Sequence, residues 1–163
     1  MKTVFTYRIL MSLLFMVIVA SVTNCGRKNP LANQRTVTAI STSKSESGFL
    51  YVKANGFGKN PKEAKNEAIR NAISSVLFKG VPGSSVKRPL ISQPGARQAH
   101  NLFFDPFFAD NGPYLDYAVV MSHLAKDRIK VKSGVQRAII LKVNYLRLQK
   151  ALEQQGIIKK FGI

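Results

Sequence analysis

ANGFGKNPKEAKNEAIRNAISSVLFKG, residues 54–80, is the stretch of this chain with the strongest local structural signals. Asn60 is a favourable helix N-cap, Pro61 suits the first helical position, and Glu63 stands three residues after the cap, as in a capping box. A cap of this kind contributes about 1 kcal/mol to helix stability. These residues together predict a helix that begins at residue 61.

The spacing of small residues predicts how this helix packs. Ala64, Ala68 and Ala72 stand four apart and therefore lie on one stripe of a helix. Small side chains allow a helix to sit close to a neighbouring layer. We predict a helix from Pro61 to about Phe78 whose alanine stripe packs against a sheet.

The segments on either side of the helix have the composition of strands and turns. Residues 48–54 (GFLYVKA) are β-rich and aromatic, which predicts a strand, and residues 55–58 have the composition of a turn. A loop rich in glycine and proline follows over residues 81–99. Two further strands are predicted over 114–121 and 129–133.

The C-terminal part predicts one more strand and one more helix. A strand over 136–143 places Ile139, Leu141 and Val143 on one face, and Asn144 can cap a helix over 145–155. The resulting order is strand, helix, long loop, strands, helix. This order predicts a small α+β fold, a mostly antiparallel sheet with two helices packed on one face.

Four phenylalanines, Phe103, Phe104, Phe107 and Phe108, fall within six residues. They have two interpretations. As core, they cover one end of the sheet beneath the long loop; as surface, they form a docking patch for a partner or a membrane. Phenylalanine is among the residues most often buried, which favours the core.

The first 25 residues have the layout of an export signal. Lys2 and Arg8 form a basic region, residues 9–20 (ILMSLLFMVIVA) are almost purely apolar, and residues 21–25 (SVTNC) have the pattern of a cleavage site. The cysteine that ends this segment resembles the lipobox of bacterial lipoproteins. There the thiol is diacylglyceryl-modified, the chain is cut before the cysteine, and the new amino terminus is acylated.

Cys25 is the only cysteine in the chain. An unpaired cysteine in an oxidising compartment calls for an explanation, and lipidation supplies one. One alternative is an uncleaved helical anchor, although the apolar stretch is shorter than the roughly 20 residues that span a bilayer. The other is an ordinary secreted protein, since Asn24 stands where the lipobox usually has Gly, Ala or Ser.

We therefore predict three parts: a lipoprotein-type signal peptide over 1–24, a flexible basic tether over 25–47, and a single α+β domain over 48–163. The tether is polar and rich in Ser, Thr and Asn, with little apolar periodicity. Cleavage before Cys25 leaves 139 of the 163 residues, which is enough for one hydrophobic core.

The chain is strongly basic, with a formal net charge of +17, and removing Lys2 and Arg8 with the signal peptide leaves +15. Such an excess predicts attraction to polyanions, among them lipid phosphates, lipopolysaccharide, nucleic acid or an acidic protein. The plainer interpretation is general solubility and surface charge.

A basic alternation gives the charge a candidate location. Lys126, Arg128, Lys130 and Lys132 are two residues apart, so on a strand they project from one face, and Arg137 follows nearby. Such a ladder can track a row of phosphates. It can equally be a solvated face or a guarded edge strand, because lysines commonly protect sheet edges from aggregation.

The residue patterns of cofactor and metal sites are weak. Gly56-Phe57-Gly58 lacks the third glycine of a dinucleotide-binding turn. His100 and His123 are the only histidines, whereas a zinc site needs three or four protein ligands. We predict no cofactor, no metal and no evident small-molecule substrate.

Three aspartates, Asp105, Asp110 and Asp116, are close in sequence and could bracket a sugar or a cation. Turn-forming and capping roles explain them equally well. A secreted hydrolase that uses them is the least favoured alternative. We predict that the protein is not an enzyme and has no catalytic residues.

Several stretches together resemble a known family. They are ANGFGKNPKEA (54–64), LFKGVPGS (77–84), VNY (143–145) and GIIKKFGI (156–163). This combination resembles an uncharacterised family of small lipoproteins of Gram-negative bacteria, over most of the mature chain. The strand, Gly-x-Gly segment and alanine-rich helix also resemble the N-terminal domain of flagellar-ring assembly proteins and related outer-membrane lipoproteins, over about a third of the chain. The second resemblance implies a non-catalytic module that packs into an envelope assembly.

These observations predict a membrane-anchored, non-enzymatic envelope lipoprotein that acts as a structural or protein-interaction module, with envelope proteins as partners. The absence of an acidic run after Cys25 favours a protein that faces the periplasm, and we predict the outer membrane as its location. The alternative is a polyanion-binding lipoprotein that uses the basic strand face on lipopolysaccharide or nucleic acid.

Overall fold

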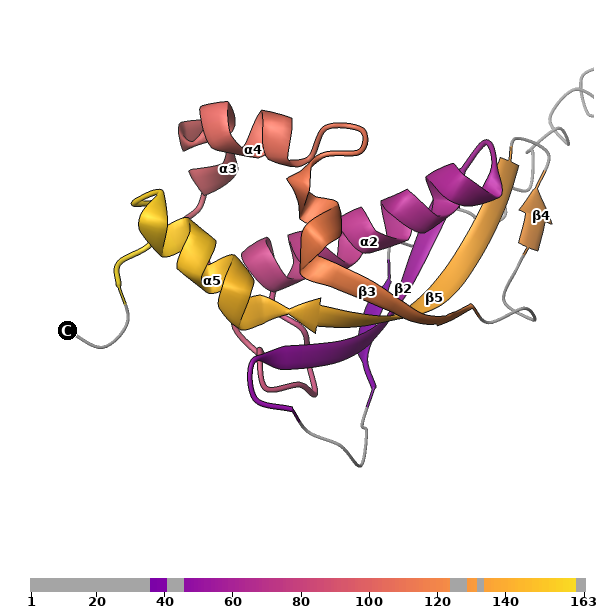
Figure 1. The fold of residues 1–163 in the computed structure, drawn as a ribbon, viewed down its shortest axis with the longest axis horizontal. Coiled ribbons are helices and arrows are strands. Elements are labelled where there is room, and N and C mark those ends of the chain that lie inside the picture. Colours follow the sequence, from indigo (N-terminus) through magenta and orange to yellow (C-terminus); the bar gives the residue numbers. More distant parts are fainter. Residues whose placement is uncertain (1–35, 41–45, 124–128, 132–133, 161–163) are drawn as a thin grey trace, which may run out of the picture. The chain divides into compact units, whose positions relative to one another are not determined.

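The computed structural model describes residues 36–40, 46–123, 129–131 and 134–160 (Figure 1). All of them belong to one compact unit over residues 31–163. The predicted signal peptide and Cys25 lie outside the described residues. The elements are β1 (Val37–Ala39), β2 (Phe49–Gly58), α2 (Pro61–Phe78), α3 (Ala96–Ala99), α4 (Asn101–Phe107), the 3-10 helix η2 (Pro113–Tyr117), β3 (Ala118–His123), β4 (Ile129–Val131), β5 (Gly134–Asn144) and α5 (Tyr145–Gln154).

The strands form one antiparallel sheet in the order β1-β2-β5-β3, and β4 pairs with the other end of β5. The longest ladder joins β2 to β5, from the pair Phe49 and Asn144 to the pair Gly58 and Val135. Figure 1 shows α2 lying along the sheet across β2 and β5. The predicted α+β fold is confirmed.

The capped helix has the predicted bounds, and its cap satisfies the first free backbone N–H groups. The Asn60 side-chain oxygen accepts hydrogen bonds from the N–H groups of Lys62 and Glu63, both at 3.0 Å. The Glu63 carboxylate accepts from the N–H of Lys59 at 2.8 Å. In a standard capping box this carboxylate accepts from the backbone N–H of the cap residue, whereas here it accepts from the Asn60 side-chain amide, at 2.6 Å, and from the backbone N–H of the preceding residue.

The predicted turn over residues 55–58 is wrong, because these residues continue β2. The reason is the position of α2. A Cβ at Gly56 would overlap the backbone of Ala64 and Ala68, and one at Gly58 would overlap the backbone N of Ala64. The glycines therefore serve the close approach of a helix to a strand rather than a reversal of the chain.

The core lies between α2 and one face of the sheet. Ala64, Ala68 and Ala72 of α2 are fully buried, which confirms that the alanine stripe faces inward. The opposing layer is made of alternate residues of the two central strands: Leu50, Val52, Ala54, Ile139, Leu141 and Val143. Because side chains alternate along a strand, residues between these point to the other face.

Two further helices complete this core. Leu148 and Leu152 of α5 are fully buried in it, and Asn144 caps α5 by accepting from the N–H of Arg147 at 2.9 Å. The phenylalanine cluster is mainly core: Phe104, Phe107 and Phe108 are buried, and Phe103 is half-buried. Leu102, on the short helix α4, is 91% exposed.

Two predicted segments differ from the structure. Residues 37–39, assigned to the flexible tether, form β1 and pair with β2, where Thr36 also accepts a hydrogen bond from the side chain of Asn55 at 2.7 Å. The predicted strand over 114–121 begins only at Ala118, because Pro113 starts a 3-10 helix that places Tyr114 in the core. In residues 114–117, side-chain packing across the molecule outweighs the local preference for a strand.

Candidate functional site

The structure describes only part of the predicted basic ladder. Lys126, Arg128 and Lys132 lie outside the described residues, as does Cys25. Lys130 is exposed on β4, where it is paired with Val135 of β5. Residues paired across an antiparallel ladder share a face, and Arg137 is two residues from Val135, so Lys130 and the half-buried Arg137 lie on the same side of the sheet.

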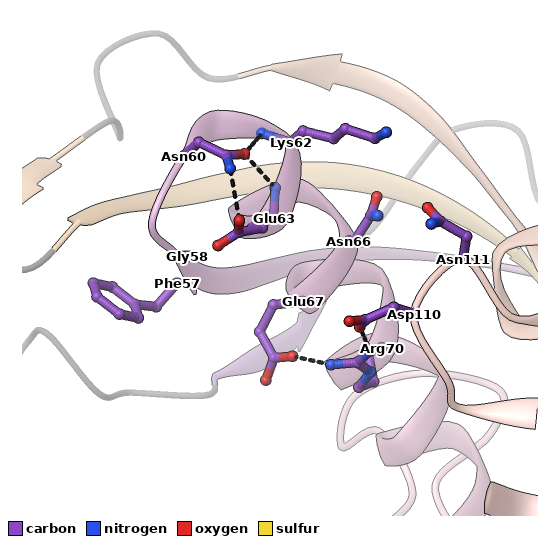
Figure 2. A pocket seen from close by; sticks show the side chains of 10 residues that line it. All are labelled: Phe57, Gly58, Asn60, Lys62, Glu63, Asn66, Glu67, Arg70, Asp110 and Asn111. Carbon is purple, nitrogen blue, oxygen red and sulfur yellow. Dashed lines mark hydrogen bonds and ion pairs between the residues drawn. The ribbon is translucent and has the colours of Figure 1, made fainter. Parts of the chain in front are cut away.

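A polar groove of about 490 Å³ runs between the first half of α2 and the loop after α4 (Figure 2). It is lined by Phe57, Gly58, Asn60, Lys62, Glu63, Asn66, Glu67, Arg70, Asp110 and Asn111. Figure 2 shows Phe57 turned away from the other labelled side chains. Because three of the chain's eight acidic residues line this groove, it is less suited to a polyanion than the rest of this basic protein.

Arg70 is the central residue of the groove. Its guanidinium donates to Glu67 at 2.9 Å and to Asp110 at 3.1 Å, and so joins α2 to a loop 40 residues away (Figure 2). The Asp110 side chain is 98% exposed, so its ion pair contributes only about 0.2–1 kcal/mol. Burial acts to lower the pKa of Arg70, but Tyr114, Asp110 and Glu67 outweigh it and raise that pKa.

Tyr114 lies beneath this ion pair. Its ring is fully buried, and the Arg70 guanidinium carbon lies 5.3 Å from the ring centroid. Neither the Tyr114 hydroxyl nor the Arg70 Nε atom has a hydrogen-bond partner among the described residues. Burial raises the pKa of Tyr114, and the positive charge of Arg70 only partly opposes this.

This arrangement stabilises the groove rather than presenting free catalytic groups. Glu63 accepts hydrogen bonds at the helix cap, and Glu67 and Asp110 both bind Arg70. Of the three clustered aspartates, only Asp110 lines the groove; Asp105 is on α4 and Asp116 is on η2. Within the described ranges, no three His, Cys, Asp or Glu side chains are grouped so that they could hold a metal ion.

A second ionic cluster lies on the opposite face of the sheet. Lys142 forms an ion pair with Glu46, and its Nζ lies 4.1 Å from the ring centroid of Phe49. Tyr51 donates its hydroxyl hydrogen bond to the same glutamate at 3.0 Å. The hydrogen bond to Glu46 is the main reason that the pKa of Lys142 is raised.

The edge strand β3 is the most apolar exposed part of the sheet. Among the described strands it pairs only with β5. Val119 is 62% exposed and Met121 is 53% exposed, and a bulge between Val120 and Ser122 interrupts the ladder. Exposed apolar side chains on a strand with a free edge favour pairing with another chain.

An apolar groove of about 450 Å³ lies near the phenylalanine cluster. Its lining residues include Leu102, Phe103, Phe107, Tyr117 and Ile157. Part of the cluster therefore borders an open surface although most of it is core. None of the helices in the described ranges has the length and apolar character needed to cross a membrane.

Sequence reasoning missed the polar groove and the apolar edge. The spacing of Glu67 and Arg70 indicates an i,i+3 ion pair on a helix, but the third partner, Asp110, is distant in sequence. The exposure of Val119 depends on which strand ends the sheet, and no local pattern encodes that position.

Comparison with protein-family models, with curated proteins and with solved structures finds no match for this chain. The resemblance to small Gram-negative lipoproteins and to flagellar-ring assembly proteins therefore stays a prediction.

Proposed function

We propose that this protein is a non-enzymatic lipoprotein of the cell envelope, anchored through Cys25, and that its α+β domain is a protein-interaction module. The proposed location is the outer membrane, facing the periplasm. The anchor is supported by the signal-like layout of residues 1–25 and by the single cysteine that ends it. Two or three acyl chains, at about 0.8 kcal/mol per buried CH₂, would make the attachment effectively permanent.

One observation carries the interaction role: the exposed apolar side chains of Val119 and Met121 on an edge strand. The ionisable side chains at the centre of the polar groove instead pair with one another, as Arg70 does with Glu67 and Asp110. A surface that offers apolar contacts and backbone hydrogen bonds fits a protein partner better than it fits a small polar substrate.

Fractionation of cells that express the wild type and Cys25→Ala tests the anchor. We expect the wild type in the membrane fraction and the variant either released or left with its signal peptide uncleaved. Metabolic labelling with a fatty acid provides a direct readout, and we expect label on the wild type alone. Identical fractionation of the two proteins, with no label on either, would contradict lipidation.

Polyanion binding is a second candidate function, because Lys130 is exposed and shares one side of the sheet with Arg137 in a chain of high positive charge. Binding of this kind weakens steeply as salt displaces the counterions that association releases. We expect binding to lipopolysaccharide or single-stranded DNA to be lost in Lys130→Glu/Lys132→Glu. The matched control is Lys159→Glu/Lys160→Glu, which makes the same charge change outside the basic ladder, near the C-terminus. Equal loss in both variants would indicate a general charge effect rather than a site.

A further inference from the structure

The outer side of β3 is a free strand edge in the sheet described. β5 has neighbours on both sides, with β2 along one side and β3 and β4 along the other. The opposite edge of the sheet is β1, a strand of only three residues, Val37–Ala39. The six-residue strand Ala118–His123 is therefore the longer of the two edges.

The residues of β3 have the chemistry of a strand that can pair with its own copy. Its sequence, AVVMSH, contains no Lys, Arg, Asp, Glu or Pro, so neither a charge nor a missing backbone N–H guards the edge. Val119 is paired with Lys142, whose charge is already matched by Glu46. Two copies of this edge can therefore meet without placing like charges opposite each other.

The bulge between Val120 and Ser122 limits the contact. Bulges disturb the regular ladder and are one device by which proteins prevent indefinite edge-to-edge growth. The regular part of the edge is Ala118–Val120, so a paired strand gains a short ladder together with apolar contacts from Val119 and Met121. A short contact of this kind predicts a reversible dimer rather than an open fibre.

We propose that β3 pairs antiparallel with β3 of a second copy of this chain, across a two-fold axis that passes near Val119. The contact is isologous, since the same patch is used on both subunits, and it continues the antiparallel sheet from one subunit into the next. It deepens the proposed interaction role by naming the partner as the chain itself. The overall positive charge opposes association at long range, but charges more than about 8 Å apart are largely screened at physiological salt.

Disulfide trapping tests the register of this contact. Ala118→Cys, Val119→Cys and Val120→Cys are each introduced singly into the full chain, purified in detergent, with Thr38→Cys on β1 as the matched edge control. Residues directly opposite each other in an antiparallel pair have Cα atoms about 4.5–5.5 Å apart, which a disulfide can bridge. We expect Val119→Cys to give about tenfold more trapped dimer than Thr38→Cys, equivalent to 1.4 kcal/mol.

The wild type, whose only cysteine is Cys25, tests the proposed anchor independently of the dimer. A disulfide dimer of the wild type would report a free Cys25 thiol and so contradict lipidation, and the scan is then made in Cys25→Ala. Sedimentation velocity provides the second measurement: the wild-type dimer fraction should rise with concentration. We expect the dimer dissociation constant to rise by about tenfold or more in Val119→Lys and to stay unchanged in Thr38→Lys.

Two results would overturn the proposal. One is a wild type that stays monomeric at every concentration. Binding of a different protein at β3 by such a monomer would count against the dimer in the same way. The other is equal trapping at Val119 and Thr38.

Discussion

β2 and β3, which pair with opposite sides of β5, differ in almost every respect. β2 pairs with it over ten residues without interruption and has α2 packed directly onto its glycines, whereas β3 pairs over five residues with a bulge. Val52 on β2 is fully buried, whereas Val120, which lies level with it on β3, is only half-buried, and Val119 on the outer face of β3 is 62% exposed. The side of β5 that pairs with β2, the stabilising flank, therefore contributes most to stability. The side that pairs with β3, the exposed flank, leaves apolar surface available for contact.

The difference shows how a small domain can serve both purposes. The stabilising flank is built from small residues that bring a helix and a strand very close, so any added atom there meets backbone. On the β3 side, Val119 and Met121 are largely exposed, so these two side chains can change with little effect on folding. Substitutions on the two flanks should therefore separate stability from association.

Gly56→Ala should have the largest effect on stability. The new Cβ would overlap the carbonyl oxygen of Ala64 and the backbone N of Ala68, and neither can move without displacing α2. We expect a loss of about 3 kcal/mol or more, at or beyond the upper end of overpacking costs, measured by chemical denaturation. Gly95→Ala is the control for the opposite case: its φ of 74° is unfavourable for alanine, but no atom lies within 4 Å of the added Cβ, whereas Gly56 has no such φ and only close contacts. The expected loss for Gly95→Ala is about 1–2 kcal/mol. A loss at Gly56 no larger than the loss at Gly95 would contradict the close contact between Gly56 and α2.

Leu141→Ala and Val119→Ala compare the inner face of β5 with the exposed residue of β3. Leu141 is fully buried, so its truncation removes apolar contacts and leaves a cavity, with an expected loss of about 2–5 kcal/mol. Val119→Ala should change stability by no more than about 0.5 kcal/mol. The same denaturation curves, collected on dilute protein, measure both. A loss above 1 kcal/mol in Val119→Ala would indicate that β3 is part of the folding core.

Tyr114→Phe should have a small effect on stability, with the opposite sign to Gly56→Ala and Leu141→Ala. It removes a buried hydroxyl that has no hydrogen-bond partner among the described residues, and leaving such a group unpaired costs about 1–3 kcal/mol. We expect the variant to be more stable by up to about 1 kcal/mol at neutral pH. A destabilised variant would show that the hydroxyl is hydrogen-bonded in solution.

The same variant makes a pH prediction. Because burial raises the pKa of Tyr114 in the folded state, the unfolded chain loses this proton first as the pH rises through its unfolded pKa near 10. The stability associated with the protonated hydroxyl is therefore present below that pH and is lost above it. Tyr114→Phe should lose less stability than the wild type between neutral pH and pH values above 10. Parallel stability–pH curves would contradict the raised pKa.

Several parts of the fold could be predicted from sequence because neighbouring residues determine them. The cap at Asn60, the proline after it and the spacing of Ala64, Ala68 and Ala72 predicted both the bounds of α2 and its inward face. Alternation in β5 likewise predicted that Ile139, Leu141 and Val143 share the buried face. These signals involve residues that lie within two turns of one helix or within one strand.

The candidate sites were less predictable. Alternation suggested a basic face, but the structure describes only Lys130 and Arg137 of the five proposed residues, and the lipidation of Cys25 stays a prediction. The polar groove requires Arg70 to meet Asp110 across 40 residues, and the apolar edge requires β3 to be the last strand. Both depend on which elements become neighbours in space, and a local pattern does not specify that.

The sequence by itself therefore determined the helix, the alternating strand and the α+β class, because backbone capping and hydrophobic periodicity act over short distances. Only the tertiary structure decided that Gly56 and Gly58 belong to a strand under a helix, that Tyr114 enters the core from a 3-10 helix, and that Val119 stays exposed. The physical reason is that these outcomes depend on long-range packing, in which close contact with distant residues outweighs the local preference of the chain.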